Sequence, residues 1–259
     1  MNASIAPIIL AIIQGIAEWF PISSSGHLVL FSKLLNYPNT LSLDLALHFG
    51  TLMAVFVYFG KDITDILRDV FRLRFNTENG RLGLFVVVAT IPAAIFGFLF
   101  RNFFETELNN LMLLCVGFAI TGVILLISSL NLGVKRQDKI TFRIALLIGL
   151  AQCASLFRGI SRSGSTMSAG VLQGLDQRKA ARFSFLMSIP IIFGANILAV
   201  GSTSIPTSYL LPALVSFFVG LATIHILLKF VLTSKRNLRW FGIYVLLVAL
   251  ALGSWLLLS

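Results

Sequence analysis

Charged residues are scarce in this chain of 259 residues: they make up 12% of the sequence, against 57% hydrophobic residues. A soluble domain carries about 25% charged residues, so this chain has too few to cover a surface that faces water throughout. Its mean hydropathy is correspondingly high, at +0.93. The composition excludes a soluble globular protein and indicates an integral membrane protein.

Acidic residues, cysteines and the common cofactor motifs are also few or absent. The 10 acidic residues stand against 20 basic ones, which gives a net charge of +10. The basic residues fall mainly in short gaps between apolar runs, where they meet anionic head groups, so we expect membrane lipids and no nucleic acid as partners. Cys115 and Cys153 lie inside apolar segments, which argues against a disulfide or metal framework. Without a Walker loop, H-E-x-x-H, C-x-x-C or dinucleotide motif, nothing supports ATP-driven transport.

Six apolar stretches are long enough to cross a membrane, which takes about 20 helical residues. They lie at about 43–60, 82–100, 111–130, 183–200, 210–228 and 240–258. Two other apolar regions, 4–35 and 144–175, are interrupted by what we call the first polar segment (19–27) and the second polar segment (158–166). Because each half of these regions is too short to cross, both are predicted to be re-entrant helix–loop–helix hairpins. The predicted fold is therefore an all-α integral membrane protein with six transmembrane helices and two re-entrant hairpins.

The basic residues predict the orientation of these spans. Sixteen of the 20 lie in four gaps that six spans place on one face, at 61–81, 135–143, 178–182 and 229–239. The positive-inside rule makes this face cytoplasmic, and the chain a multi-pass protein of the cytoplasmic membrane. Both termini and the opening of the first hairpin then lie on the extracytoplasmic side. The same side holds Lys33, Arg101, Glu105 and Glu107.

An internal repeat accompanies this topology. A shift of 138 residues aligns 14–27 with 152–165 at five identities in fourteen positions, and each match begins a hairpin followed by three spans. Hairpins that enter from opposite faces are typical of an inverted-topology repeat, whose ligand site lies where the halves meet. We predict a single membrane domain, 1–259, with repeat halves at about 1–130 and 139–259. The site should combine both polar segments.

Ionisable groups inside the membrane mark the first candidate residues. Such groups cost about 2.5–3.5 kcal/mol at a helix centre and are functional candidates for that reason. Gln14 and Glu18 are four residues apart and so share one helical face. The alternative is that Glu18 only reaches toward the head groups.

Polar residues then open the second helix of the first hairpin: Ser23, Ser24, Ser25, Gly26 and His27. A hydroxyl caps such a helix, and its free N–H groups favour an anion. His27 lies three residues past Ser24 and so falls on the same turn. The alternatives are simple capping by the serines and a structural role for the histidine.

The second polar segment has the same layout with an arginine added. Arg162 presents a planar fork suited to phosphate, and it is framed by Ser161, Ser163, Ser165 and Thr166 at another helix N-terminus. Two positive helix ends, an arginine and many hydroxyls predict an anion pocket that suits phosphate.

Other ionisable residues carry weaker signals. Asp44 and His48 are four residues apart at the outer end of a span. They could line or gate the pocket, and the alternative is a purely structural role. His225, Glu105 and Glu107 are expected to be interfacial residues.

Both polar segments resemble the undecaprenyl-pyrophosphate phosphatases, also called the bacitracin-resistance protein family. The first family signature, E/Q-x-x-x-E followed by P-x-S-S-x-G-H, is matched by Gln14, Glu18, Pro21, Ser23, Ser24, Gly26 and His27. The second, P-G-x-S-R-S-x-x-T, is matched by Gly159, Ser161, Arg162, Ser163 and Thr166. The chain departs from the family at Gln14, where many members have glutamate, and at Arg158, which replaces a proline.

The resemblance implies hydrolysis of a polyprenyl (undecaprenyl) diphosphate to the monophosphate and inorganic phosphate, recycling the lipid carrier for cell-envelope glycan synthesis. Arg162 would hold the terminal phosphate with the helix N-termini. Glu18 would act as a base or hold a divalent cation, Mg²⁺ or Ca²⁺. Ser24 or His27 would be the nucleophile, or His27 would activate water.

Two other functions compete with this hypothesis. A polyprenyl-phosphate flippase or small-anion transporter would use the same inverted-repeat architecture. A lipid phosphatase of the acid phosphatase type would share Ser25, Gly26 and His27, but it requires a histidine where this chain has Ser168. The sequence leaves the assembly state open, with a homodimer as one option.

Overall fold

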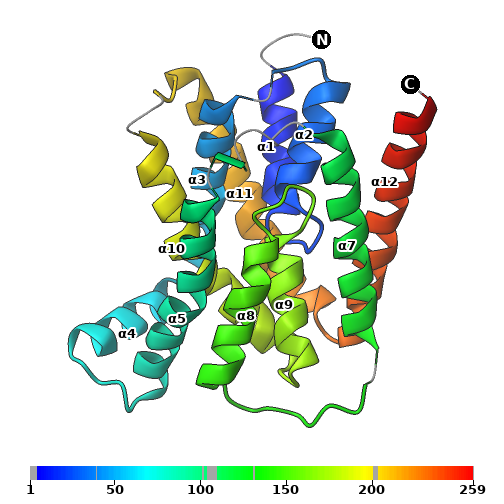
Figure 1. Ribbon diagram of the computed structural model, residues 1–259. Coiled ribbons are helices and arrows are strands. Elements are labelled where there is room, and N and C mark those ends of the chain that lie inside the picture. The colour runs from blue at the N-terminus through cyan, green and yellow to red at the C-terminus, as the bar shows by residue number, and fades with distance from the viewer. Residues whose placement is uncertain are drawn as a thin grey trace.

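The computed structural model describes residues 5–38, 40–100, 102–103, 110–130, 132–200 and 204–258, and only the backbone of 198–200. Over these residues the chain is all-helical, as predicted, with 11 α-helices and no β-strand (Figure 1). The helices are α1 (Ala6–Ala17), α2 (Ser24–Leu34), α3 (Leu41–Tyr58), α4 (Gly60–Phe71), α5 (Glu78–Leu99), α7 (Leu111–Ser129), α8 (Phe142–Ala154), α9 (Arg162–Leu172), α10 (Gln177–Val200), α11 (Leu210–Ile226) and α12 (Leu238–Leu258).

All six predicted membrane spans are confirmed by helices long and apolar enough to cross a bilayer. They are Leu41–Tyr58, Glu78–Leu99, Leu111–Ser129, Gln177–Ile197, Thr207–Val231 and Lys235–Leu258. The spans at Glu78 and Gln177 begin four and six residues earlier than predicted, because their first turns carry charged residues that lower the local hydropathy while remaining helical. Thr77 caps the first of these turns, and its Oγ1 accepts a hydrogen bond from the Gly80 N–H at 3.0 Å.

Four short helices form two packed pairs. Helices α1 and α2 have 12 and 11 residues, and α8 and α9 have 13 and 11. At 1.5 Å per residue each covers less than about 20 Å, too little to cross the hydrocarbon core. Figure 1 shows α1 and α2 in the upper half of the molecule and α8 and α9 in the lower half, with their connecting loops between them at mid-height. The two polar segments therefore lie at the centre of the bundle.

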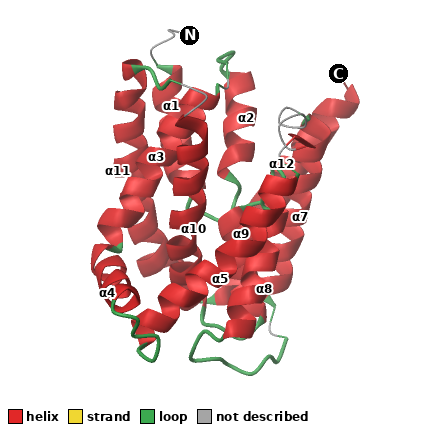
Figure 2. Cartoon of the chain, turned by 60° about the vertical axis from the view of Figure 1, so that its left-hand side comes forward, coloured by secondary structure: helices red, strands yellow, loops and turns green. Residues whose placement is uncertain are grey.

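Helix α4 lies in a gap where the sequence analysis predicted no element. It packs on α5 at the lower end of the molecule (Figure 2), with Ile66 buried and Ile63 and Val70 against the core. Phe71, at its end, is 82% exposed, and Lys61 pairs with Asp65 at 2.6 Å on its polar side. A short helix with one apolar and one charged face is typical of the membrane–water boundary.

Close helix contacts hold the centre together. The main pairs are α7 with α12, α3 with α11, α5 with α8, and α1 with α11. A Cβ atom on Gly149 of α8 would lie 2.5 Å from the Ala89 carbonyl oxygen of α5, so only glycine permits this approach. Trp19 of the first polar segment is fully buried and meets the Phe185 ring edge-on at 5.0 Å. The first polar segment is thus packed against α10.

Candidate functional site

Glu18 is the centre of the candidate site. It follows α1 directly, is 6% exposed, and its carboxylate contacts groups from four helices. Its Oε1 pairs with Nη2 of Arg162. Its Oε2 accepts hydrogen bonds from Ser24 Oγ at 2.6 Å and from Gln14 Nε2 at 3.0 Å. The His48 Nε2 lies 3.5 Å from the same oxygen.

Arg162 is the first residue of α9 and brings the second polar segment to this carboxylate. Its Nη1 donates to the Ser184 carbonyl of α10 at 3.4 Å, and its guanidinium carbon lies 5.7 Å from the centre of the Trp19 ring. A guanidinium has five N–H donors, so the contacts with Glu18 and Ser184 leave donors for a ligand. Its side chain is 13% exposed, which makes it a partly buried cation held in a fixed direction.

A second contact joins the two polar segments. Ser163 Oγ donates to the Phe20 carbonyl at 3.2 Å, and Ser163 and Ser161 exchange a hydrogen bond between hydroxyls at 3.2 Å. Ser161 also caps α9, since its Oγ accepts from the Gly164 N–H at 3.0 Å. The structure thus brings residues 144 positions apart into one polar cluster between the N-termini of α2 and α9.

The N-terminus of α2 is held in an unusual backbone conformation. Ser23 precedes the helix with φ 71° and ψ 93°, a region that non-glycine residues rarely adopt, and its Oγ accepts from the Gly26 N–H at 3.4 Å. A Cβ atom on Gly26 would lie 2.6 Å from the Phe118 ring, so α2 sits directly on α7. Ser24 and Ser25 remain half-buried, and Ser24 is the one whose hydroxyl points to Glu18.

His27 lies one turn further along α2 and is 2% exposed. Its Nδ1 is 2.8 Å from the Ser23 carbonyl, and its Nε2 is 2.9 Å from the Tyr244 hydroxyl of α12. Because a carbonyl only accepts, Nδ1 carries the hydrogen, and Nε2 of the neutral ring accepts from Tyr244. Both ring nitrogens therefore form hydrogen bonds with other groups, and neither contacts the Glu18 carboxylate.

Helix α7 anchors the second polar segment. Thr121 Oγ1 donates to the Gly159 carbonyl and accepts from the Ser161 N–H, both at 2.9 Å. Gly159 has φ +89°, and a Cβ there would lie 2.4 Å from the Leu114 carbonyl oxygen. The family glycine is thus required by its backbone angle and by its closeness to α7.

Two further predicted residues lie deeper in the second half. Thr166 is fully buried; its hydroxyl donates to the Arg162 carbonyl at 2.7 Å and lies 2.6 Å from Ser184 Oγ. Ser165 Oγ and both amide atoms of Gln152 are buried without a hydrogen-bond partner among the described residues. Thr166 supports the helix that carries Arg162 and does not face Glu18.

Asp44 and His48 extend the cluster to α3. His48 Nδ1 donates to the Asp44 carbonyl at 2.8 Å, which directs Nε2 toward Glu18. The Asp44 carboxylate pairs with Arg158 Nη2 at 3.4 Å. Arg158, which stands where the family has proline, thereby ties the second polar segment to α3.

Several contributors were not foreseen from the sequence: Thr121, Ser184 and Tyr244 from three spans, and Trp19 beneath Arg162. For the three span residues the available signal was a polar side chain within an apolar span, which does not tell on which face of the helix that side chain lies. His225, expected at the interface, lies 3.4 Å from the Tyr58 hydroxyl through its Nδ1, away from the cluster. Arg101, Glu105 and Glu107 lie outside the described residues.

The oxygen atoms around Glu18 fit a divalent cation only when a substrate supplies further ligands. Within the described residues no group of three His, Cys, Asp or Glu side chains could hold a metal. Gln14 Oε1, however, is buried beside Glu18 without a hydrogen-bond partner in the described part of the chain. Mg²⁺ is commonly held by one or two carboxylates together with water and substrate phosphates. Glu18 could supply one such carboxylate, and Gln14 Oε1 a neutral oxygen beside it.

These observations define a multi-pass membrane protein whose polar centre is built from two short helix pairs. Residues 7–251 match the family model of the bacitracin resistance protein BacA. The chain belongs to this family, which confirms the resemblance of its two motifs.

Curated relatives extend over nearly the whole chain. The undecaprenyl-diphosphatase of Thermosipho melanesiensis is 42% identical over 243 residues, covering 94% of this chain and 96% of that protein. The undecaprenyl-diphosphatase of Caldicellulosiruptor bescii is 40% identical over 97% of each chain. That of Methanococcus vannielii is 38% identical over 94% of this chain and 96% of its own.

Proposed function

We propose that this chain is an undecaprenyl-diphosphatase, which hydrolyses the lipid diphosphate to undecaprenyl phosphate and inorganic phosphate. The observation that carries the proposal is the contact between Glu18 and Arg162, with Ser24 hydrogen-bonded to the same carboxylate. Named relatives at about 40% identity over nearly the full length support the same activity.

Arg162 and the two helix N-termini hold the terminal phosphate. Phosphoryl transfer depends mainly on positioning and on stabilising charge at the transferring group. Arg162 supplies the charged donors, while the first N–H groups of α2 and α9, including those of Ser24 and Ser163, supply neutral ones. Ser23, Ser25, Gly26 and Ser161 complete the cradle, and the prenyl tail lies between spans in the bilayer.

Ser24 is the nucleophile that this geometry favours. Its hydroxyl already donates to Glu18 at 2.6 Å, so the carboxylate takes the proton as Oγ attacks the terminal phosphorus. The bond from that phosphorus to the bridging oxygen breaks, and its electron pair leaves on undecaprenyl phosphate. Glu18 passes its proton to the departing undecaprenyl phosphate and is a base again. It then takes a proton from the water that attacks the phosphoserine and returns it to Ser24 Oγ as the bond from Oγ to phosphorus breaks, which releases inorganic phosphate.

His27 acts by positioning in this scheme. Its two ring nitrogens link the N-terminus of α2 to Tyr244 of α12, which fixes the turn on which Ser24 lies. A nucleophilic or basic His27 would first have to release Tyr244, because Nε2 is the nitrogen with the free electron pair.

A divalent cation, Mg²⁺ or Ca²⁺, would be held by Glu18 and Gln14 together with the diphosphate, and it would neutralise part of the phosphate charge. We expect Gln14→Glu to lower the Mg²⁺ concentration for half-maximal activity by about tenfold, because it adds a second carboxylate beside Glu18. Titration of Mg²⁺ into chelator-treated enzyme measures this shift. Gln152→Glu, at the repeat-related position, is the matched control, and an equal shift in both variants would count against the site.

The membrane arrangement is part of the proposal. The two short helix pairs act as re-entrant hairpins, and the halves 1–130 and 139–259 form an inverted repeat. Equivalent packing supports this: α1 lies on α11 as α8 lies on α5, and α3 on α11 as α10 on α5. The basic gaps lie toward the cytoplasm, and the site opens to the extracytoplasmic side.

Phosphate release tests the function. Purified protein in detergent should release inorganic phosphate from undecaprenyl diphosphate, and Glu18→Ala should abolish the release. Intact protein that releases none, yet moves a polyprenyl phosphate across reconstituted vesicles, would instead be a flippase or transporter.

A further inference from the structure

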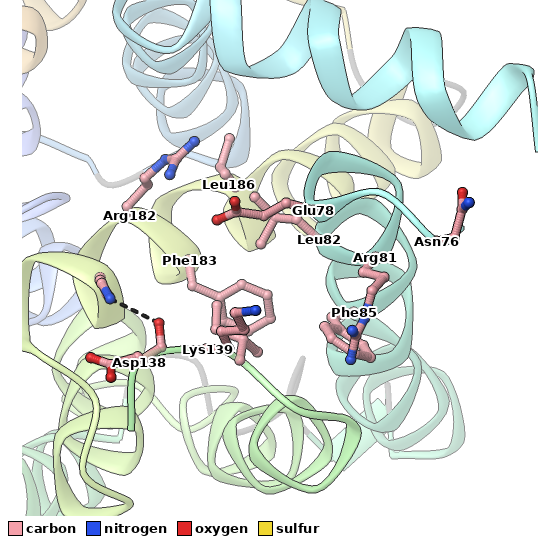
Figure 3. A pocket seen from close by; sticks show the side chains of 12 residues that line it. Asn76, Glu78, Arg81, Leu82, Phe85, Asp138, Lys139, Arg182, Phe183 and Leu186 are labelled. Atoms are coloured by element: carbon pink, nitrogen blue, oxygen red, sulfur yellow. Dashed lines mark hydrogen bonds between the residues drawn. The ribbon is translucent and has the colours of Figure 1, made fainter. Parts of the chain in front are cut away.

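A polar cavity, separate from the Glu18 centre, opens at the basic end of the molecule (Figure 3). It has a volume of about 220 Å³ and is lined by the first turns of α5 and α10 and by the loop before α8. Its charged lining residues are Arg81, Lys139, Lys179, Arg182, Glu78 and Asp138. Four cations against two carboxylates give the lining a net charge of +2 and select for an anion.

Two of these four cations, Arg81 and Lys139, are available to a ligand. The other two have partners in the protein: Lys179 donates to the Asp138 carbonyl at 2.8 Å, and Arg182 pairs through Nε with Asp62 of α4 at 2.9 Å. Within the described residues no carboxylate pairs with Arg81 or Lys139. Arg81 only lies over the Phe85 ring, at 5.8 Å from its centre.

The floor of the cavity is apolar. Phe85, Phe183 and Leu186 are 6%, 1% and 3% exposed, and Figure 3 shows charged side chains around the two aromatic rings. A small hydrated anion gains nothing from such a floor, whereas the glycerol and upper chain region of a phospholipid does.

The position of the cavity selects the same ligand. It lies where two candidate spans begin, beside the short amphipathic helix α4, and helices of that kind favour the level of the head groups. From there α5 presents a row of exposed apolar side chains along its length, at Leu84, Val87, Ile91 and Ile95. Acyl chains can follow this row into the bilayer.

We propose that this cavity is a binding site for an anionic phospholipid of the leaflet at the basic face, with Arg81 and Lys139 holding the head-group phosphate. Basic pockets between membrane helices are suited to such head groups. The site is independent of the proposed phosphatase activity, since it shares no residue with the Glu18 centre.

Lipid titration of the purified full-length protein tests this assignment. Phosphatidylglycerol in mixed micelles should bind wild type more tightly than phosphatidylcholine, as followed by native mass spectrometry and thermal unfolding. The double variant Arg81→Gln/Lys139→Gln should weaken phosphatidylglycerol binding about 25-fold, because each basic side chain near an anionic surface contributes about fivefold.

The matched control is Arg72→Gln/Arg74→Gln, which removes the same charge from exposed positions of the same face outside the cavity. It should weaken binding much less. Equal weakening by both double variants, or equal affinity for phosphatidylcholine, would overturn the proposal. So would equal stabilisation by inorganic phosphate alone, which would make the cavity a site for the free anion. Both variants replace exposed side chains, so unfolding without lipid checks that they fold.

Discussion

Replacing Arg162 by lysine should lower kcat for undecaprenyl diphosphate by about 10³-fold or more, the effect of losing an arginine that stabilises a transferring phosphoryl group. Lysine keeps the charge beside Glu18 but loses the planar fork that reaches Glu18 and Ser184 while still presenting donors to phosphate. Phosphate release at saturating substrate measures the change.

The variant of its ion-pair partner, Glu18→Gln, should lower kcat at least as much. It places a neutral amide near Ser24 and Gln14, which removes the proton acceptor and leaves a partly buried guanidinium without its counter-charge, at a cost of about 3–5 kcal/mol in stability. Thermal unfolding measures that loss of stability separately from the loss of activity. The loss of activity, measured as kcat, is expected for Arg162→Lys as well. Arg68→Lys, in an exposed pair on α4, is the control and should retain full activity. A kcat within tenfold of wild type for Arg162→Lys would contradict the proposed role.

The second large effect is expected at Ser24. Ser24→Ala should lower kcat by about 10³-fold or more, because no covalent intermediate then forms and only the binding and charge stabilisation remain. Ser25→Ala removes the neighbouring hydroxyl, which makes no hydrogen bond to Glu18, and should cost less than about tenfold.

Trapping the intermediate distinguishes the nucleophiles. Rapid quenching with a substrate labelled in its terminal phosphate should leave an acid-stable phosphoenzyme in wild type and none in Ser24→Ala. An acid-labile, alkali-stable adduct would identify His27 instead, and Tyr244→Phe, which frees Nε2, would then raise its yield. Full activity without any labelled protein would mean direct attack by water.

Much of the fold follows from the sequence because hydropathy reports directly on the membrane. Six spans were predicted close to their observed positions, since length and apolar character suffice for them. Helix α4 is missing from the prediction, because the gap between the first two spans is rich in Lys and Arg and was used only to predict the orientation of the spans. The spacing of Ile63, Ile66 and Val70 carried a helical signal, which could have revealed it.

The centre of the site was predictable where its contacts are local. Gln14 and Glu18 are related by one helical turn, and Ser161 caps the helix that begins with Arg162. The direction of His27 was not predictable, because its partner Tyr244 lies 217 residues away. Thr121 and Ser184 escaped notice for the same reason. Arg158 departs from the family proline, and the structure gives it an acidic partner, Asp44, that no local pattern indicates.

The pairing of Glu18 with Arg162 draws the acid from one half of the chain and the cation from the other. A molecule in which only one half has inserted and packed correctly holds half of a reaction centre and turns over nothing. If this pair is the reaction centre, as proposed, turnover reports that both halves have assembled, and newly made chains stay inactive until α9 has docked beside α1.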